Sequence, residues 1–169
     1  MGLRIAVYAG LMVVADALHT TWLVRVALGG AVLDPLLLLV LAAGVYRGPE
    51  AGAVLGLCAG FLQDLMGGLS LGIFALARLV VGFLVGVVST SLYLEAALVP
   101  LAVAFAGTWA QQAMWAGVGW TTGVLTVSPG DWAVRTAVQA VMNAAAAPGV
   151  FWMFRRLDAW VTPLSRRAR

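Results

Sequence analysis

The chain has 169 residues, of which 63% are hydrophobic and only 10% are charged, and its formal net charge is +3. An ordinary soluble domain is about 45–50% apolar even with glycine counted, so this composition excludes both a water-soluble fold and a disordered chain. It indicates a protein embedded in lipid, and we predict one helical domain over residues 1–154 followed by a basic cytoplasmic tail over residues 155–169.

Apolar runs separated by glycine, proline and charged residues predict an all-α integral membrane protein with six transmembrane helices. Their approximate bounds in chain order are 4–24, 33–46, 49–66, 71–90, 95–120 and 131–154. A helix needs about 20 residues to cross the hydrocarbon core. The second run has only 14 residues, so we expect either a short helix in a thinned bilayer or a re-entrant pair with its neighbour.

The first run also resembles the core of a signal peptide. Residues 5–14 are apolar, and Ala15-Asp16-Ala17 loosely fits a cleavage site of the A-x-A type. An acidic residue is unusual at that position, and the apolar stretch continues through Trp22-Leu23-Val24. We therefore predict a retained first helix, with a cleaved leader as the alternative.

The arginines predict the orientation in the membrane. Arg4, Arg47 and the five arginines after the last run fall on one side, Arg25 and Arg135 fall on the other, and Arg78 lies within the fourth run. Loops that carry more arginine and lysine face the cytoplasm. We predict a multi-pass protein with both termini cytoplasmic, whose basic tail attracts anionic membrane lipid. A nucleic acid is not an expected partner, because the chain lacks a folded basic face with stacking aromatics.

Glycines recur every fourth residue in the middle of the chain. Between the second and fourth runs lie Gly48, Gly52, Gly56 and Gly60, and the fourth run carries Gly82 and Gly86. Residues four apart share one helix face, and small residues there let two helices approach closely in lipid. The spacing predicts helix packing, which general bundle packing would also explain, and a homodimer through the Gly82 and Gly86 face stays open.

The glycine ladder belongs to a longer motif. It continues as Gly60-Phe61, Asp64-Leu65-Met66-Gly67-Gly68, Leu71-Gly72, Ala75-Leu76 and Gly82. This stretch, over about residues 33–86, resembles the MreD family, the integral membrane component of the bacterial rod-shape machinery, or elongasome. The family's hallmark is a glycine-rich helix that ends in Asp-Leu, then a turn and Leu-Gly, which places Gly67, Gly68, Leu71 and Gly72 in the motif turn. The family usually has Pro-Asp before the second helix, where this chain has Asp34-Pro35.

The resemblance implies a fold, a location and partners. The fold would be a six-helix bundle like the S-component of energy-coupling-factor transporters, with a pocket open to the outside of the bacterial inner membrane. The partner would be MreC, and directly or through it RodA with its penicillin-binding transpeptidase, and MreB. The implied function is a non-enzymatic scaffold or regulator of cell shape and lateral peptidoglycan synthesis. The alternative is an S-component-like substrate-binding subunit of a vitamin transporter.

Several polar side chains fall at a similar depth, in the outer half of the predicted bundle. They are Asp16, His19, Asp64, Arg78, Gln111, Gln112, Arg135 and Gln139. An unpaired charge within the bilayer costs at least about 2.5 kcal/mol, so Arg78 requires an acidic partner, for which we expect Asp64 or Asp16. An ion pair that locks three helices is the favoured interpretation. A pocket for a polar ligand or a partner's side chain, and a proton or ion relay, are the alternatives.

The sequence predicts no catalytic residue, cofactor or metal site. Gly68-Leu69-Ser70-Leu71-Gly72 matches G-x-S-x-G, but that motif requires a strand before the serine and a histidine base. The single histidine, His19, precedes it and is expected to be a hydrogen-bonded helix residue. We predict that Ser70 is the N-cap of the fourth helix.

Overall fold

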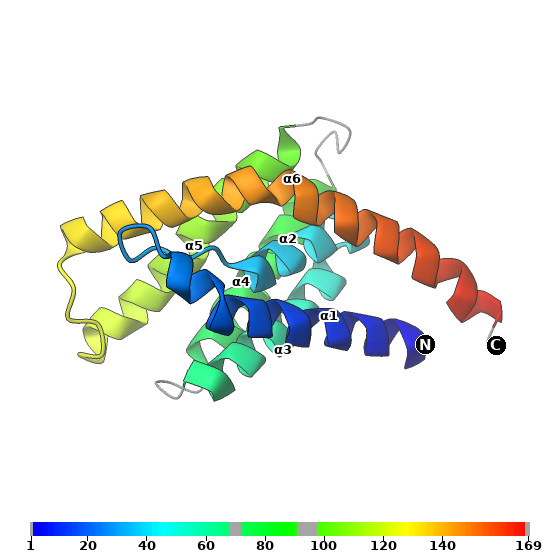
Figure 1. The fold of residues 1–169 in the computed structure, drawn as a ribbon, viewed down its shortest axis with the longest axis horizontal. Helices are drawn as coiled ribbons and strands as arrows, with labels where there is room; N and C mark the ends of the chain where they lie inside the picture. Colours follow the sequence, from blue (N-terminus) through cyan, green and yellow to red (C-terminus); the bar gives the residue numbers. More distant parts are fainter. Residues whose placement is uncertain (1, 68–71, 91–97, 168–169) are drawn as a thin grey trace.

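The computed structural model describes residues 2–67, 72–90 and 98–167, and these are helical with short connections. The elements are α1 (Gly2–Thr21), the 3-10 helix η1 (Leu23–Val26), α2 (Pro35–Arg47), α3 (Pro49–Gly67), α4 (Ile73–Ser89), α5 (Val99–Thr121) and α6 (Pro129–Arg167). The six α-helices of the described residues confirm the all-α class and follow the predicted runs to within a few residues, except at the end of α6 (Figure 1).

Helix α2 is the centre of the bundle. It has 13 residues, and all ten from Leu36 to Val45 are buried, because α1, α3, α4, α5 and α6 all contact it. A helix that is apolar on every side is stable only where no side faces water. The short second run is therefore the core of this fold.

The ends of α2 are fixed by local sequence. Asp34 is the N-cap, and its side chain accepts a hydrogen bond of 2.9 Å from the Leu37 backbone N–H. At the other end Gly48 adopts a φ of +88°, which glycine tolerates, and Pro49 then begins α3. Gly48 is the break between α2 and α3 and not a residue of the third helix, but its backbone still lies against α4, since a Cβ on Gly86 would lie 2.7 Å from the Gly48 carbonyl carbon.

The remaining glycines lie where α3 and α4 touch backbone to backbone. A Cβ added to Gly56 would lie 2.3 Å from the Arg78 carbonyl oxygen, and one added to Gly60 would lie 2.4 Å from the Ala75 Cα. Gly52 and Gly82 face each other, since a Cβ on either would lie within 2.3 Å of the other's carbonyl oxygen. Side chains here would force the helices apart.

The same contact bears on the possible homodimer. A Cβ on Gly86 would lie 2.4 Å from the Pro49 Cα, so α3 covers the Gly82 and Gly86 face along its length. A second copy could reach that face only if α3 moved away. A homodimer through these two glycines is therefore incompatible with this packing.

Helix α6 is longer than predicted. It runs for 39 residues, passes Pro148 without interruption and includes residues 155–167, so the predicted basic tail is a continuation of the last helix. Within the described residues it is the one helix that is long and apolar enough to cross a membrane, over Pro129–Val161. Shorter apolar helices are Ala6–Thr21, Pro35–Arg47 and Ile73–Ser89. Six crossings remain a prediction.

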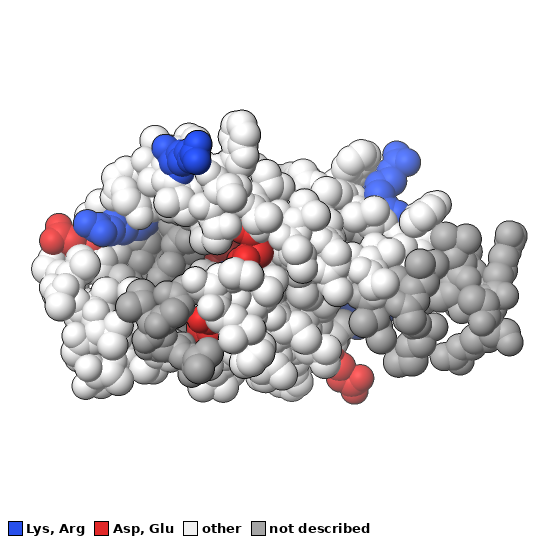
Figure 2. Space-filling model, turned by 60° about the horizontal axis from the view of Figure 1, so that its bottom comes forward, with Lys and Arg blue, Asp and Glu red and all other residues white. Residues whose placement is uncertain are grey.

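The outer surface of the bundle is apolar. Large side chains such as Leu65 and Val134 are 56% and 65% exposed, and similar residues occur on α1, α3, α4, α5 and α6. Figure 2 shows a face on which charged side chains occupy only a few separate points. Soluble monomers rarely expose continuous apolar surface on this scale, so the surface suits a lipid environment.

Candidate functional site

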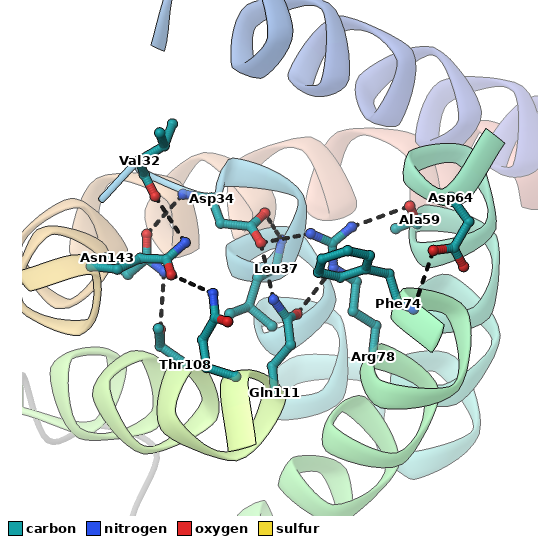
Figure 3. A network of polar contacts seen from close by, with 12 residues as sticks. Val32, Asp34, Leu37, Ala59, Asp64, Phe74, Arg78, Thr108, Gln111 and Asn143 are labelled. Carbon is teal, nitrogen blue, oxygen red and sulfur yellow. Dashed lines mark hydrogen bonds and ion pairs between the residues drawn. The ribbon is translucent and has the colours of Figure 1, made fainter. Parts of the chain in front are cut away.

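Arg78 and Asp34 form a buried ion pair at the centre of the bundle. Arg78 is 0% exposed and Asp34 is 3% exposed, and Arg78 Nη2 donates to Asp34 Oδ2 over 2.6 Å (Figure 3). The prediction that Asp64 or Asp16 pairs with Arg78 is wrong. Because α2 is short and lies in the core, its N-cap Asp34 lies inside the bundle, where it meets the second turn of α4.

The guanidinium of Arg78 is held from three further directions. Its Nε donates to Gln111 Oε1 on α5 over 3.1 Å, and its Nη1 donates to the Ala59 carbonyl on α3 over 3.2 Å. The Phe74 ring lies 5.8 Å from the guanidinium carbon, close enough for a cation–π contact. Gln111 Nε2 also donates to Asp34 Oδ2 over 3.2 Å. A buried charge pair is tolerable where such hydrogen bonds complete it, so this network fixes α2, α3, α4 and α5 together.

A second branch of the network reaches α6. The Asp34 backbone N–H donates to Asn143 Oδ1 over 2.9 Å, and Asn143 Nδ2 donates to Thr108 Oγ1 over 2.9 Å. All three residues are buried. Sequence reasoning left Asp34, Thr108 and Asn143 out of the polar cluster. The signal was present for Asp34, because Asp-Pro before an apolar run is typical of a helix N-cap.

Asp64 has a different role from the one expected. This buried residue of α3 accepts hydrogen bonds from the backbone N–H groups of Gly72 (2.9 Å), Ala75 (3.0 Å) and Phe74 (3.3 Å), at the start of α4. The first N–H groups of a helix have no partner within it, and this is costly without water. The acid of the Asp-Leu motif thus caps the next helix across the turn.

Part of the motif turn lies within the described residues. Gly67 is the last residue of α3, and Gly72 is the N-cap of α4 with a φ of +102°. The prediction that Ser70 is the N-cap is therefore wrong, since Gly72 occupies the position and Asp64 supplies the oxygen atoms. Gly68, Ser70 and Leu71 lie outside the described residues.

A cavity lies at the end of the molecule that contains the α5–α6 connection. We call it the outer cavity; its volume is about 310 Å³, and it is an open hollow between α1, α4, α5, α6 and the segment before α2. It is lined by His19, Gly30, Ala31, Val32, Phe74, Gln112, Trp115, Leu125, Val127, Trp132, Arg135, Thr136 and Gln139. In its wall, Gln112 Nε2 donates to Gln139 Oε1, and Gln139 Nε2 donates to the Val32 carbonyl over 2.8 Å.

The predicted polar cluster is thus divided among separate places. Arg78 and Gln111 belong to the buried network, Asp64 caps α4, and His19 and Gln139 line the outer cavity. Asp16 is buried on α1, and its Oδ1 has no hydrogen-bond partner in the described part of the chain. The structure does not bring all of these groups into one site.

A second polar cluster lies at the opposite end of the molecule and was not predicted. Arg47, the last residue of α2, donates through Nε to Asp158 Oδ1 over 2.8 Å and through Nη2 to the Tyr8 hydroxyl over 3.2 Å. Tyr8 in turn donates to Asp158. These contacts join α1 and α2 to the extension of α6.

Comparison with known families decides the assignment. The family described as rod shape-determining protein MreD matches residues 3–125 of the chain, which is well over half of it. The chain belongs to the MreD family. Membership places it in a family of membrane proteins with a role in determining rod shape. Comparisons with curated proteins and with solved structures gave no match.

The match covers most of the buried network. The MreD region contains Asp34, Asp64, Arg78 and Gln111, whereas Asn143 and Asp158 lie on α6, beyond residue 125. The ion pair, the helix cap and the α3–α4 glycine contact are therefore features of the MreD part of the chain. The likeness to an S-component stays a prediction.

Proposed function

We propose that this chain is a non-enzymatic membrane scaffold that binds MreC within the elongasome. Through that contact, or directly, it would also reach RodA, its penicillin-binding transpeptidase and MreB during lateral peptidoglycan synthesis. Membership of the MreD family supports the role in rod shape. The partners are those that the motif around Asp64 and Gly72 implied.

The buried network is the observation that carries a structural role. The charged groups of Arg78 and Asp34 are engaged with each other and with neighbouring amides, and Asp64 is engaged with the first turn of α4. Charged groups whose hydrogen bonds are all made within the bundle fix its helices in place and are not free to hold a substrate. A fixed bundle with an apolar exterior presents a constant surface to other membrane segments.

We propose a multi-pass topology in the inner membrane with both termini cytoplasmic. The start of α1 and the end of α6 lie at the same end of the molecule, as an even number of crossings requires (Figure 1). Arg47 bonds to Asp158 on the last part of α6, whereas Arg25 lies in η1, after the end of α1, and Arg135 lies near the start of α6. This separation agrees with the excess of arginine in cytoplasmic segments.

The proposal is tested by purification of the tagged chain from rod-shaped cells of its source in a mild detergent. We expect MreC among the retained proteins, and we expect depletion of the chain to turn rods into spheres. An unrelated multi-pass protein with the same tag is the control. Absence of MreC above this control, from cells whose shape is unaffected by the loss, would contradict the scaffold.

One observation favours the transporter alternative. The outer cavity is a place where a substrate-binding subunit of the S-component type could hold a small molecule. Such a subunit would be recovered with an energising partner that hydrolyses nucleotide. The purification described above separates the two functions by the identity of the proteins retained.

A further inference from the structure

We infer that the outer cavity binds an anionic oxygen group, a carboxylate or a phosphate, attached to an apolar body. This inference does not depend on the proposed scaffold function, because it rests on the lining of the cavity. A scaffold and a transporter subunit would both retain such a site.

The charge of the lining is the first step. Arg135 is the one charged residue among the described residues that line the cavity, and Asp131, four residues before it on α6, is bonded to Ser128 and does not line the cavity. The two ion pairs found between described residues join Arg78 to Asp34 and Arg47 to Asp158, so neither of them neutralises Arg135. A concave surface with a positive charge and no acid attracts an anion.

The position of the Arg135 guanidinium is the second step. A Cβ added to Gly30 would lie 3.4 Å from the guanidinium carbon and 3.4 Å from Nη1. The guanidinium therefore lies beside the Gly30 backbone, in the segment before α2, while Arg135 lines the cavity. Arginine held in place can offer two parallel N–H donors to a carboxylate or phosphate.

The walls define the rest of the ligand. Phe74, Trp115 and Trp132 supply aromatic surface to the lining. The Trp132 ring packs edge-on against the rings of Trp109 and Trp120, and these contacts hold this wall in place. The apolar part of the ligand would lie against these rings.

The size of the cavity limits the apolar body. Its volume of about 310 Å³ is at the lower end of the range of about 300–1,000 Å³ for small-molecule sites. One aromatic ring with its acid group fits this limit, and so does the glycerophosphate part of a lipid whose acyl chains lie outside. A free organic acid and an anionic lipid headgroup share the chemistry that Arg135 would recognise.

The experiment compares two probes that differ in charge alone. The purified full chain, in a neutral detergent, is titrated with 4-nitrobenzoate and with the neutral 4-nitrobenzamide, and quenching of tryptophan fluorescence is measured. In parallel, native mass spectrometry counts the phosphatidylglycerol and phosphatidylcholine molecules that stay bound. We expect the benzoate to bind at least about tenfold more tightly than the amide, since a hydrogen bond to a charged group contributes that much.

Variants assign the effect to Arg135. Arg135→Gln should remove the preference for the anion, and Arg135→Lys, which keeps the charge, should retain part of it. Arg25→Gln is the matched control, because Arg25 is an exposed arginine toward the same end of the molecule and does not line the cavity. Retention of phosphatidylglycerol that depends on Arg135, without binding of the benzoate, would also support the site and would identify a lipid headgroup as its ligand.

Three results would overturn the inference. The first is equal binding of the benzoate and the amide with no preference for phosphatidylglycerol. The second is no binding of any probe. The third is an equal loss of anion binding in Arg25→Gln and Arg135→Gln. None of these results bears on the recovery of MreC, so failure of this site and failure of the scaffold are distinguishable.

Discussion

Arg78 and Asp34 lie 44 residues apart in the chain, yet Arg78 Nη2 and Asp34 Oδ2 are 2.6 Å apart in the interior. The pair joins the N-cap of the central helix to the second turn of α4, and Gln111 bonds to both members. Loss of either charge would therefore leave the other one buried without its counter-charge.

We expect Asp34→Asn to destabilise the fold by about 3–5 kcal/mol, because removal of one partner of a buried ion pair leaves an uncompensated charge. Thermal unfolding in detergent measures the effect. The double variant Asp34→Asn with Arg78→Met should be more stable than Asp34→Asn alone, since it removes the orphaned cation. Additive losses in the double variant would contradict direct pairing.

We expect Asp64→Ala to loosen the start of α4. The carboxylate accepts three backbone N–H groups, and loss of a helix cap costs about 0.5–2 kcal/mol in water-exposed helices. Hydrogen exchange at Gly72, Phe74 and Ala75 should rise, and Asp64→Asn, which keeps one carbonyl oxygen, should raise it less. The exposed Asp131→Asn serves as the control, and equal exchange in all variants would refute the cap.

We expect Gly56→Ala to destabilise the bundle by about 1–3 kcal/mol, as overpacking does. The new Cβ would lie 2.3 Å from the Arg78 carbonyl oxygen, so α3 and α4 must separate. Gly117→Ala on α5 is the matched control, because its Cβ would meet nothing within 4 Å. Helix propensity alone favours alanine over glycine in both variants, so equal unfolding temperatures in the two would show that the contact at Gly56 does not control stability.

We expect Asp158→Asn to loosen the extension of α6 without unfolding the bundle. The side chains of Arg47 and Asp158 are 26% and 23% exposed, and partly exposed pairs contribute at most about 1 kcal/mol. Limited proteolysis should cut residues 155–167 faster in this variant, whereas the midpoint of global unfolding should change little. Unchanged cleavage would show that other contacts hold the extension.

The proposed orientation predicts which residues a reagent can reach. In a Cys58→Ser background, a cysteine at position 25 should react with an impermeant maleimide in intact cells. A cysteine at position 155 should react only after the membrane is opened, because the proposal places the end of α6 in the cytoplasm. Labelling of both positions from the same side would exclude both termini being cytoplasmic.

Much of the fold could be predicted from the sequence, because apolar runs and their breaks follow directly from composition. Asp34-Pro35 and Arg47-Gly48-Pro49 mark the ends of α2 within one or two residues. The end of α6 does not follow from the sequence in the same way, because Arg155 and Arg156 end the apolar run but, as good helix formers, do not end the helix.

The candidate site was harder to predict, because which side chains meet depends on the depth within the bundle at which each helix begins. A count of 1.5 Å per residue along the first, third and fourth runs places Asp16, Asp64 and Arg78 at a similar depth, but it does not give the depth of Asp34 before the short second run. The second helix is short and central, so Asp34 lies in the interior, where it meets Arg78. The contact between Arg47 and Asp158 depends on the continuation of α6, which the sequence did not reveal.

The enclosure of α2 determines what a neighbour in the membrane can touch. A protein that approaches from any direction meets one of the five surrounding helices first, and all five pack against the same central element. Force applied by one neighbour would therefore be carried through α2 to the helices on the far side. Two proteins bound to opposite sides of the bundle would therefore be coupled mechanically through α2 without direct contact between them.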